Sequence, residues 1–224
     1  MISCLFSAGR GVQMRPILTI LLVCSLSVRA HAETRTLALY LKHPERVSAD
    51  SGQMMRSELK RLLDPARIDV VWKDFGDRKG GEDFDFVAVG SIEGSCTAGE
   101  SDLSIGTSLR ARVILAEVAV AANRILPYFN VDCPHLMRML GNRNDPAMVG
   151  RALARVIGHE LYHILARTSQ HPNVGLAKAA FSLDDLTAPG MNFDVTSLGR
   201  ISRVSIAKRD KALQLGGSHP HISS

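Results

Sequence analysis

The stretch that organises the fold runs from Asn144 to Arg167 and reads NDPAMVGRALARVIGHELYHILAR. Asn144 and Asp145 supply capping side chains, and Pro146 suits the first position of a helix. The next apolar residues recur every three to four positions, as one face of a helix requires. They are Val149, Leu153, Val156, Ile157, Leu161, Ile164 and Leu165. The pattern therefore predicts a helix that ends at about Arg167.

The residues before this helix predict a sheet with a helix packed behind it. Three short apolar segments are typical of strands, at residues 36–42, 68–72 and 84–90. Between the first two, residues 49–63 carry apolar side chains on one helical face and stop before Asp64-Pro65. The order strand, helix, strand, strand indicates an α/β or α+β sheet.

The middle and the end of the chain carry weaker patterns. Residues 112–121 suit either a helix or a strand, and their β-branched content favours a strand paired with residues 125–131. Pro127 marks that partner as an edge strand or an irregular one. After the long helix we expect a short helix over residues 176–181, a helical turn at 183–186, and a disordered end from about residue 216.

Residues 1–32 have the order of a secretory signal. Arg15 precedes the apolar residues 17–24, and the small-residue site Ala30-His31-Ala32 follows. The apolar stretch is short for a membrane span, which favours a cleaved signal. An uncleaved membrane anchor is the alternative. Cleavage after Ala32 removes three arginines and no acidic residue, leaving 192 residues with a net charge of +2. We therefore expect an exported chain, secreted or periplasmic, with no stable membrane span and no nucleic-acid partner.

Two cysteines, Cys96 and Cys133, remain after such cleavage. An even pair in an exported chain predicts one disulfide between them. The alternative is two buried free thiols, because spacing alone does not establish pairing.

The predicted helix contains the motif His159-Glu160-Leu161-Tyr162-His163, of the form H-E-x-x-H. Histidines four residues apart lie on one helical face with Cβ atoms about 5–6 Å apart, so both rings can bind one zinc ion. Glu160 can reach a water on that ion without binding the ion itself, which suits a general base. A catalytic zinc needs a third protein ligand. His171 is the first candidate, and Asp184 and Asp185 are the alternatives.

The stretch HELYHILARTSQHPNVGLAKA, residues 159–179, resembles the zincin metallopeptidases, specifically the matrixin-like members of the metzincin branch. The resemblance implies His159, His163 and His171 as zinc ligands and Glu160 as the catalytic base. The chain differs from the usual signature in three places. The third histidine comes two residues late, no glycine stands at 166 or 167, and Ala177 occupies the place of the methionine in the Met-turn.

The resemblance also implies a fold. The expectation is an α/β (α+β) zincin-like domain, with a twisted mixed sheet, a backing helix and an active-site helix. This catalytic domain would cover residues 33–195, followed by a C-terminal extension over 196–224.

The expected function is an exported zinc-dependent metallopeptidase that acts on a peptide or protein substrate. One of the segments 112–121 and 125–131 would bind that substrate in extended form along a strand edge. Two alternatives remain open at this point: a secreted zinc-binding protein without proteolytic activity, and a secreted interaction module. The sequence carries no indication of the oligomeric state.

Overall fold

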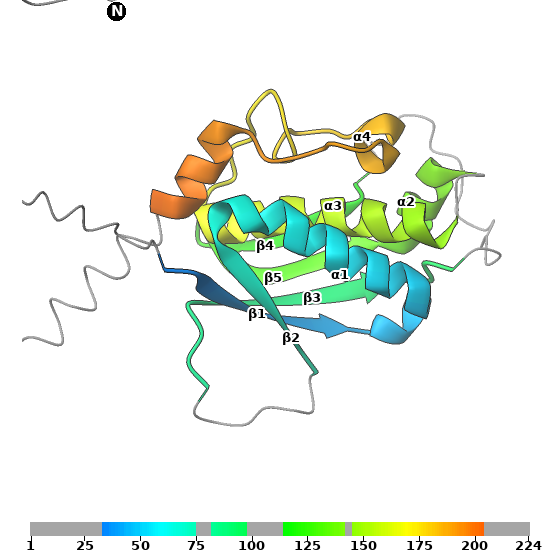
Figure 1. Ribbon diagram of the computed structural model, residues 1–224, viewed down its shortest axis with the longest axis horizontal. Helices are drawn as coiled ribbons and strands as arrows, with labels where there is room; N and C mark the ends of the chain where they lie inside the picture. The colour runs from blue at the N-terminus through cyan, green and yellow to red at the C-terminus, as the bar shows by residue number, and fades with distance from the viewer. Residues whose placement is uncertain (1–32, 75–81, 98–113, 142–144, 204–224) are drawn as a thin grey trace, which may run out of the picture. The chain divides into compact units, whose positions relative to one another are not determined.

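Five strands form one mixed sheet, and two long helices pack together against it (Figure 1). The computed structural model describes residues 33–74, 82–97, 114–141 and 145–203. The strands are β1 (Arg35–Lys42), β2 (Ile68–Lys73), β3 (Phe86–Glu93), β4 (Ala116–Ala121) and β5 (Arg124–Asp132). The helices are α1 (Ala49–Leu63), α2 (Cys133–Leu140), α3 (Pro146–Ala166) and α4 (Leu183–Thr187). The predicted signal at 1–32 and the predicted disordered end lie outside the described residues.

The strand order is β2-β1-β3-β5-β4. The first four strands of this order run parallel, and β4 pairs antiparallel with β5 at one edge. The sheet is thus mixed and the fold combines helices and strands, which confirms the prediction at that coarse level. The position of β4 matters for the site, because its outer side is free of any other described strand.

Most of the expected elements are confirmed, with shifted ends. The helix over 49–63 and the strand over 36–42 lie where the pattern predicts them, whereas β3 begins at Phe86 and continues to Glu93. The described part of the segment 112–121 contains a strand, β4, and no helix. Within the described part of the chain, no helix combines the length and the apolar character needed to cross a membrane.

Of the two alternatives that Pro127 predicts, the structure has the irregular strand and not the edge strand. β5 lies between β3 and β4. Its pairing with β4 shifts register, because Val118 pairs with Phe129 whereas Val120 pairs with Ile125. Pro127 falls inside that shifted stretch, and the pairing with β3 begins only at Tyr128. The proline nitrogen, which has no hydrogen, is therefore accommodated without breaking a regular ladder.

The predicted helix over 176–181 is wrong, since these residues form turns. Gly175 has a φ of +77°, and Leu176 donates its N–H to the carbonyl of Asn192. The carbonyl of Leu176, which an α-helix over these residues would use as an acceptor, lies 3.0 Å from Nδ1 of His159 instead. The helical turn predicted at 183–186 is confirmed by α4. Residues 195–203, which begin at the expected end of the catalytic domain, are also helical, and Ile201 among them is fully buried.

The pair Cys96 and Cys133 forms the predicted disulfide, with Cα atoms 5.0 Å apart. Cys96 lies just after β3, and Cys133 is the first residue of α2. The bond therefore ties the start of α2 to the end of a central strand.

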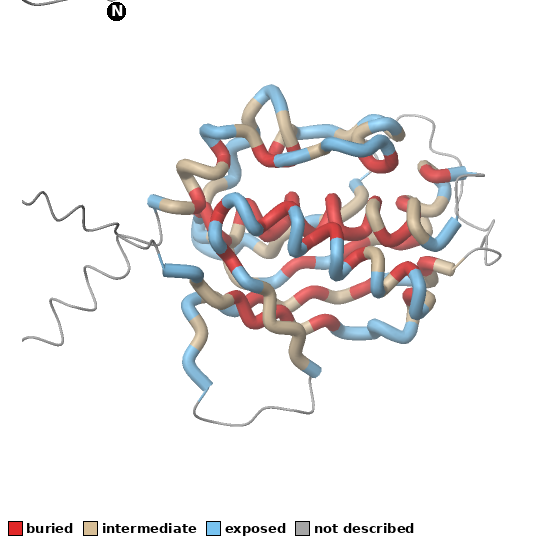
Figure 2. The backbone as a smooth tube through the Cα atoms, in the orientation of Figure 1, coloured by how far each residue is buried: buried red, intermediate tan, exposed pale blue. Residues whose placement is uncertain are grey.

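Helix α3 is the most deeply buried element of the fold (Figure 2). Of its 21 residues, 16 are buried, so the helix has no fully solvated face. Helix α1 crosses it closely at Gly150, where an added Cβ would lie 2.3 Å from the backbone oxygen of Ser51. A side chain at Gly150 is thus incompatible with the observed approach of the two helices.

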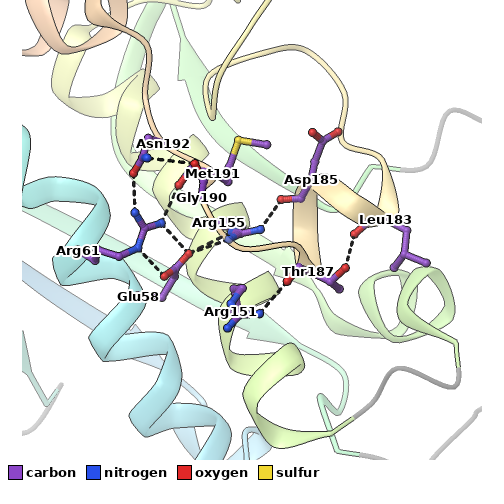
Figure 3. A network of polar contacts seen from close by, with 10 residues as sticks. All are labelled: Glu58, Arg61, Arg151, Arg155, Leu183, Asp185, Thr187, Gly190, Met191 and Asn192. Atoms are coloured by element: carbon purple, nitrogen blue, oxygen red, sulfur yellow. Dashed lines mark hydrogen bonds and ion pairs between the residues drawn. The ribbon is translucent and has the colours of Figure 1, made fainter.

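Arg155 of α3 is a charged residue inside the core, and its side chain is only 1% exposed. Its charge is compensated by a carboxylate from α1 (Figure 3). Its guanidinium donates to Glu58 of α1 at 3.1 Å, and Arg61 donates to the same carboxylate at 2.8 and 2.9 Å. Burial alone would raise the pKa of Glu58, but its hydrogen bonds and charge contacts with Arg61 and Arg155 hold that pKa below its usual value. This buried ion pair joins α1 to α3.

The ion pair yields a stability prediction. Glu58→Ala leaves the buried Arg155 without its counter-charge, and we expect it to lower the free energy of unfolding by about 3–5 kcal/mol. The double variant Glu58→Ala/Arg155→Met removes both charges and is expected to be more stable than Glu58→Ala alone, as measured by urea unfolding. If the double variant is less stable than Glu58→Ala, the loss of stability in Glu58→Ala does not come from an uncompensated charge on Arg155.

Candidate metal centre

The last two turns of α3 and the loop after it bring three histidines together. His159 and His163 are one turn apart on α3 and are 8% and 4% exposed. The helix ends at Arg167, which adopts a left-handed conformation with φ 49° and donates its N–H to the carbonyl of His163. An arginine thus takes the conformation that usually favours glycine. The chain then turns back over four residues and places His171 against the other two rings.

The three Nε2 atoms form a small triangle. His163 Nε2 lies 3.2 Å from that of His159 and 3.1 Å from that of His171, and the third side measures 3.3 Å. Nitrogens bound to a tetrahedral zinc at about 2.0–2.1 Å stand about 3.3–3.4 Å apart. The triangle therefore has nearly the size of one face of such a coordination shell.

The opposite ring nitrogens decide the tautomer of two of these histidines. Nδ1 of His159 lies 3.0 Å from the carbonyl oxygen of Leu176, and Nδ1 of His163 lies 2.6 Å from that of Thr168. A carbonyl oxygen only accepts, so each Nδ1 carries the hydrogen and each Nε2 presents a lone pair. Two lone pairs facing each other at 3.2 Å make no hydrogen bond, whereas a cation between them would bind both.

All three rings favour the neutral form that a metal ligand requires. Burial lowers the pKa of His159 to about 4, and the neighbouring rings of His163 and His171 add to that effect. Burial also lowers the pKa of His163 and of His171. At neutral pH the three nitrogens are thus available as ligands.

The loop after His171 packs against the ring of His159. Leu176 and Ala177 are fully buried there, and the Phe181 ring contacts His159 edge-on, with centroids 5.4 Å apart. The carbonyl of Leu176, from the same loop, orients the ring of His159. Tyr162 is fully buried as well, and its hydroxyl accepts a hydrogen bond from Arg200.

Glu160 is the one acidic residue of the motif and lies in the wall of the cleft beside the histidines. Its side chain is almost completely buried, and no hydrogen bond joins it to another described residue. Burial, and next the charge of Glu117, raise the pKa of Glu160 to about 8. A cation held by the three histidines would act in the opposite direction and favour the carboxylate.

The alternative third ligands, Asp184 and Asp185, lie apart from this group. The described residues with metal-binding side chains close enough to share an ion are His159, His163 and His171. Asp185 instead caps α4 at Ser182 and pairs with Lys178. Both aspartates line a separate hollow together with residues 188–194.

The histidines and Glu160 open into a cleft of about 740 Å³. Strand β4 and residues 178–181 line it, and α2 contributes His135, Arg138 and Met139. Sequence reasoning missed these three α2 residues. Their spacing of three and four marks one helical face, but nothing local in the sequence shows that this face meets the cleft.

The geometry predicts a three-histidine metal site. We expect the purified protein to hold about one equivalent of zinc. The variants His159→Ala, His163→Ala and His171→Ala should each lower zinc affinity by more than about 100-fold, because changing a residue that only supports a ligand already costs up to about 100-fold. Competition with a chromophoric chelator measures the affinity. Asp184→Ala is the matched control and should bind zinc as the parent does. A His171→Ala variant with parental affinity would place the third ligand elsewhere.

Comparisons with known proteins supply no family for this chain. No protein-family model matches it, and a search of the curated proteins finds no match. No residue role can therefore be carried over from a relative. The chemistry proposed for the chain rests on its own three histidines, on Glu160 and on the cleft that they face.

Proposed function

We propose that this chain is an exported zinc-dependent metallopeptidase with Glu160 as its general base. The observation that carries the proposal is the convergence of three Nε2 atoms beside an unpartnered carboxylate, in the wall of an open cleft. Three protein ligands leave one coordination position free, which is the arrangement of catalytic zinc sites and not of structural ones.

The donor set supports zinc as the metal. Three neutral imidazoles suit zinc, copper, iron and nickel, and the triangle of 3.1–3.3 Å matches tetrahedral geometry, which favours zinc among them. Zinc bound there would supply Lewis-acid activation of a water molecule and of the substrate carbonyl.

Glu160 is suited to move the proton that the reaction requires. It follows His159 directly, so its carboxylate faces the cleft without joining the triangle of ring nitrogens. As a carboxylate it would accept a proton from the attacking water and then deliver it to the departing amine. Two influences on its pKa oppose each other in the zinc-bound site, since burial favours the protonated acid and the bound cation would favour the carboxylate that accepts the proton.

The free outer side of β4 supports an extended peptide as substrate. β4 is the last described strand of the sheet, and its residues line the cleft. A peptide could add to this edge through backbone hydrogen bonds, which bind a chain largely independently of its sequence. Of the two segments expected to bind substrate, β4 is the one at the edge.

Export is supported by two features. The disulfide Cys96–Cys133 is typical of proteins that fold in an oxidising compartment. The pattern of residues 1–32 is that of a secretory signal.

The proposal predicts that Glu160→Gln abolishes hydrolysis and keeps the metal. With unfolded casein as substrate, kcat/KM should fall by about 10²–10⁴-fold, because the amide cannot accept the proton. Zinc content should stay at the parental level. Glu45→Gln is the matched control, an acid-to-amide change at an exposed position outside the cleft, and should keep the parental activity.

Three outcomes separate the alternatives. A Glu160→Gln variant as active as the parent contradicts the mechanism. A parent that binds one zinc and cleaves nothing supports the zinc-binding protein without proteolysis. A parent that binds no zinc, and whose unfolding is insensitive to chelator, supports the interaction module.

A further inference from the structure

Helix α2 presents a cationic side chain to the cleft that the metal chemistry does not use. His135 and Arg138, three residues apart, share one face of α2 and line the cleft. Arg138 is exposed and has no hydrogen bond or ion pair within the part of the chain that the structure describes. A guanidinium in this state retains all its donors for a ligand.

The other basic groups of the cleft are already engaged. Nδ1 of His135 lies 2.6 Å from the carboxylate of Asp132, and the Lys178 ammonium lies 2.6 Å from that of Asp185. The acidic groups that line the cleft are Glu117 and Glu160. Among the described residues, Arg138 is thus the cleft cation left without a counter-charge.

The sheet register places α2 at one end of β4. Ala116 pairs with Val131, and Asp132 donates its N–H to Leu115, one residue before α2 begins. Glu117 lines the same cleft as Glu160 and the histidines, so the reaction centre and the α2 residues open onto one cleft along β4. At about 3.3 Å per residue, the two steps along β4 from Leu115, beside the start of α2, to Glu117 correspond to about 7 Å, or two to three residues of an extended peptide.

Two constraints hold α2 in this place. The disulfide anchors Cys133 to Cys96, and the Asp132 side chain caps the helix by accepting from the N–H of His135. The wall that carries Arg138 is therefore part of the rigid fold, and its position relative to a bound peptide is set in advance.

The direction of the peptide follows from the direction of β4. β4 runs away from α2, from Ala116 to Ala121. Antiparallel pairing is the more stable kind, so a bound peptide would run toward α2. Residues on the C-terminal side of the cleaved bond would then approach Arg138.

We propose that Arg138 selects substrates with a carboxylate within about three residues on the C-terminal side of the cleaved bond. The carboxylate is that of an Asp or Glu side chain or that of the peptide's own C-terminus. This selection rests on the proposed peptidase function, since it names the substrate of the same cleft.

The experiment maps cleavage sites in a proteome-derived peptide library by mass spectrometry, with the zinc-loaded protein and the variants Arg138→Glu and Arg203→Glu. Arg203 is exposed and lies outside the cleft, so its variant matches the charge change elsewhere. The parent and Arg203→Glu should favour Asp and Glu over Lys and Arg after the cleaved bond by about twofold to fivefold, the strength of an exposed charge pair. Arg138→Glu should invert this preference, and high ionic strength should weaken it.

A second arm distinguishes the two sources of the carboxylate. It uses peptides with a free or an amidated C-terminus. If amidation removes the preference, the C-terminal carboxylate is recognised; if the preference persists, the acidic side chain is. An unchanged profile in Arg138→Glu, or a parent that prefers neither acidic side chains nor a free C-terminus after the cleaved bond, would overturn the proposal.

Failure of the peptidase function has a different signature. If neither the parent nor Arg203→Glu cleaves any peptide, the peptidase assignment fails, and the role of Arg138 is decided by binding. Fluorescence anisotropy then compares an acidic and a basic labelled peptide on the zinc-loaded parent and on Arg138→Glu. Tighter binding of the acidic peptide to the parent, reversed in the variant, supports Arg138. Equal affinities overturn its role.

Discussion

The burial of α3 on all its faces is the constraint on which the rest of this structure depends. The sheet, α1 and the segments after residue 171 enclose it, so each polar side chain that it carries must find a partner inside the protein. Arg155 finds Glu58, Tyr162 finds Arg200, and His159 and His163 find backbone carbonyls. Glu160 is the exception, since its described surroundings supply an open cleft instead of a donor. A helix built in this way holds its side chains rigidly.

The same helix organises the irregular segment that completes the site. Arg155 donates to the backbone carbonyl of Asp185, Arg151 to that of Thr187, and Arg61 of α1 to that of Met191 (Figure 3). Arginines rooted in two helices thereby hold a chain segment that has little regular structure of its own. This segment begins with Leu176, whose carbonyl orients His159, so the network of Figure 3 and the three histidines belong to one continuous arrangement.

Sequence patterns were sufficient where the information is local. The helix of the H-E-x-x-H motif and the strands of the sheet follow from periodicity and propensity. They were insufficient where a distant contact overrides local preference. Leu176 and Ala177 suit a helix, but the backbone of Leu176 contacts Asn192 and His159 instead. Pro127 lies in an interior strand, because the register shift there spares the ladder. The pairing of Glu58 with Arg155 is likewise invisible in a sequence where the two are 97 residues apart.

By itself the sequence determined which residues can do chemistry: two histidines one helical turn apart, a glutamate between them, and a third histidine within reach. Helical spacing fixes the relative positions of the two histidines and the glutamate, but not that of the third histidine. Only the tertiary structure decided that His171 and not an aspartate completes the group, that carbonyls select the ring tautomers, and that β4 and α2 wall the cleft. The physical reason is that ligand convergence and cleft shape depend on where loops fold back and which helix faces meet, and those are set by packing between segments far apart in the chain.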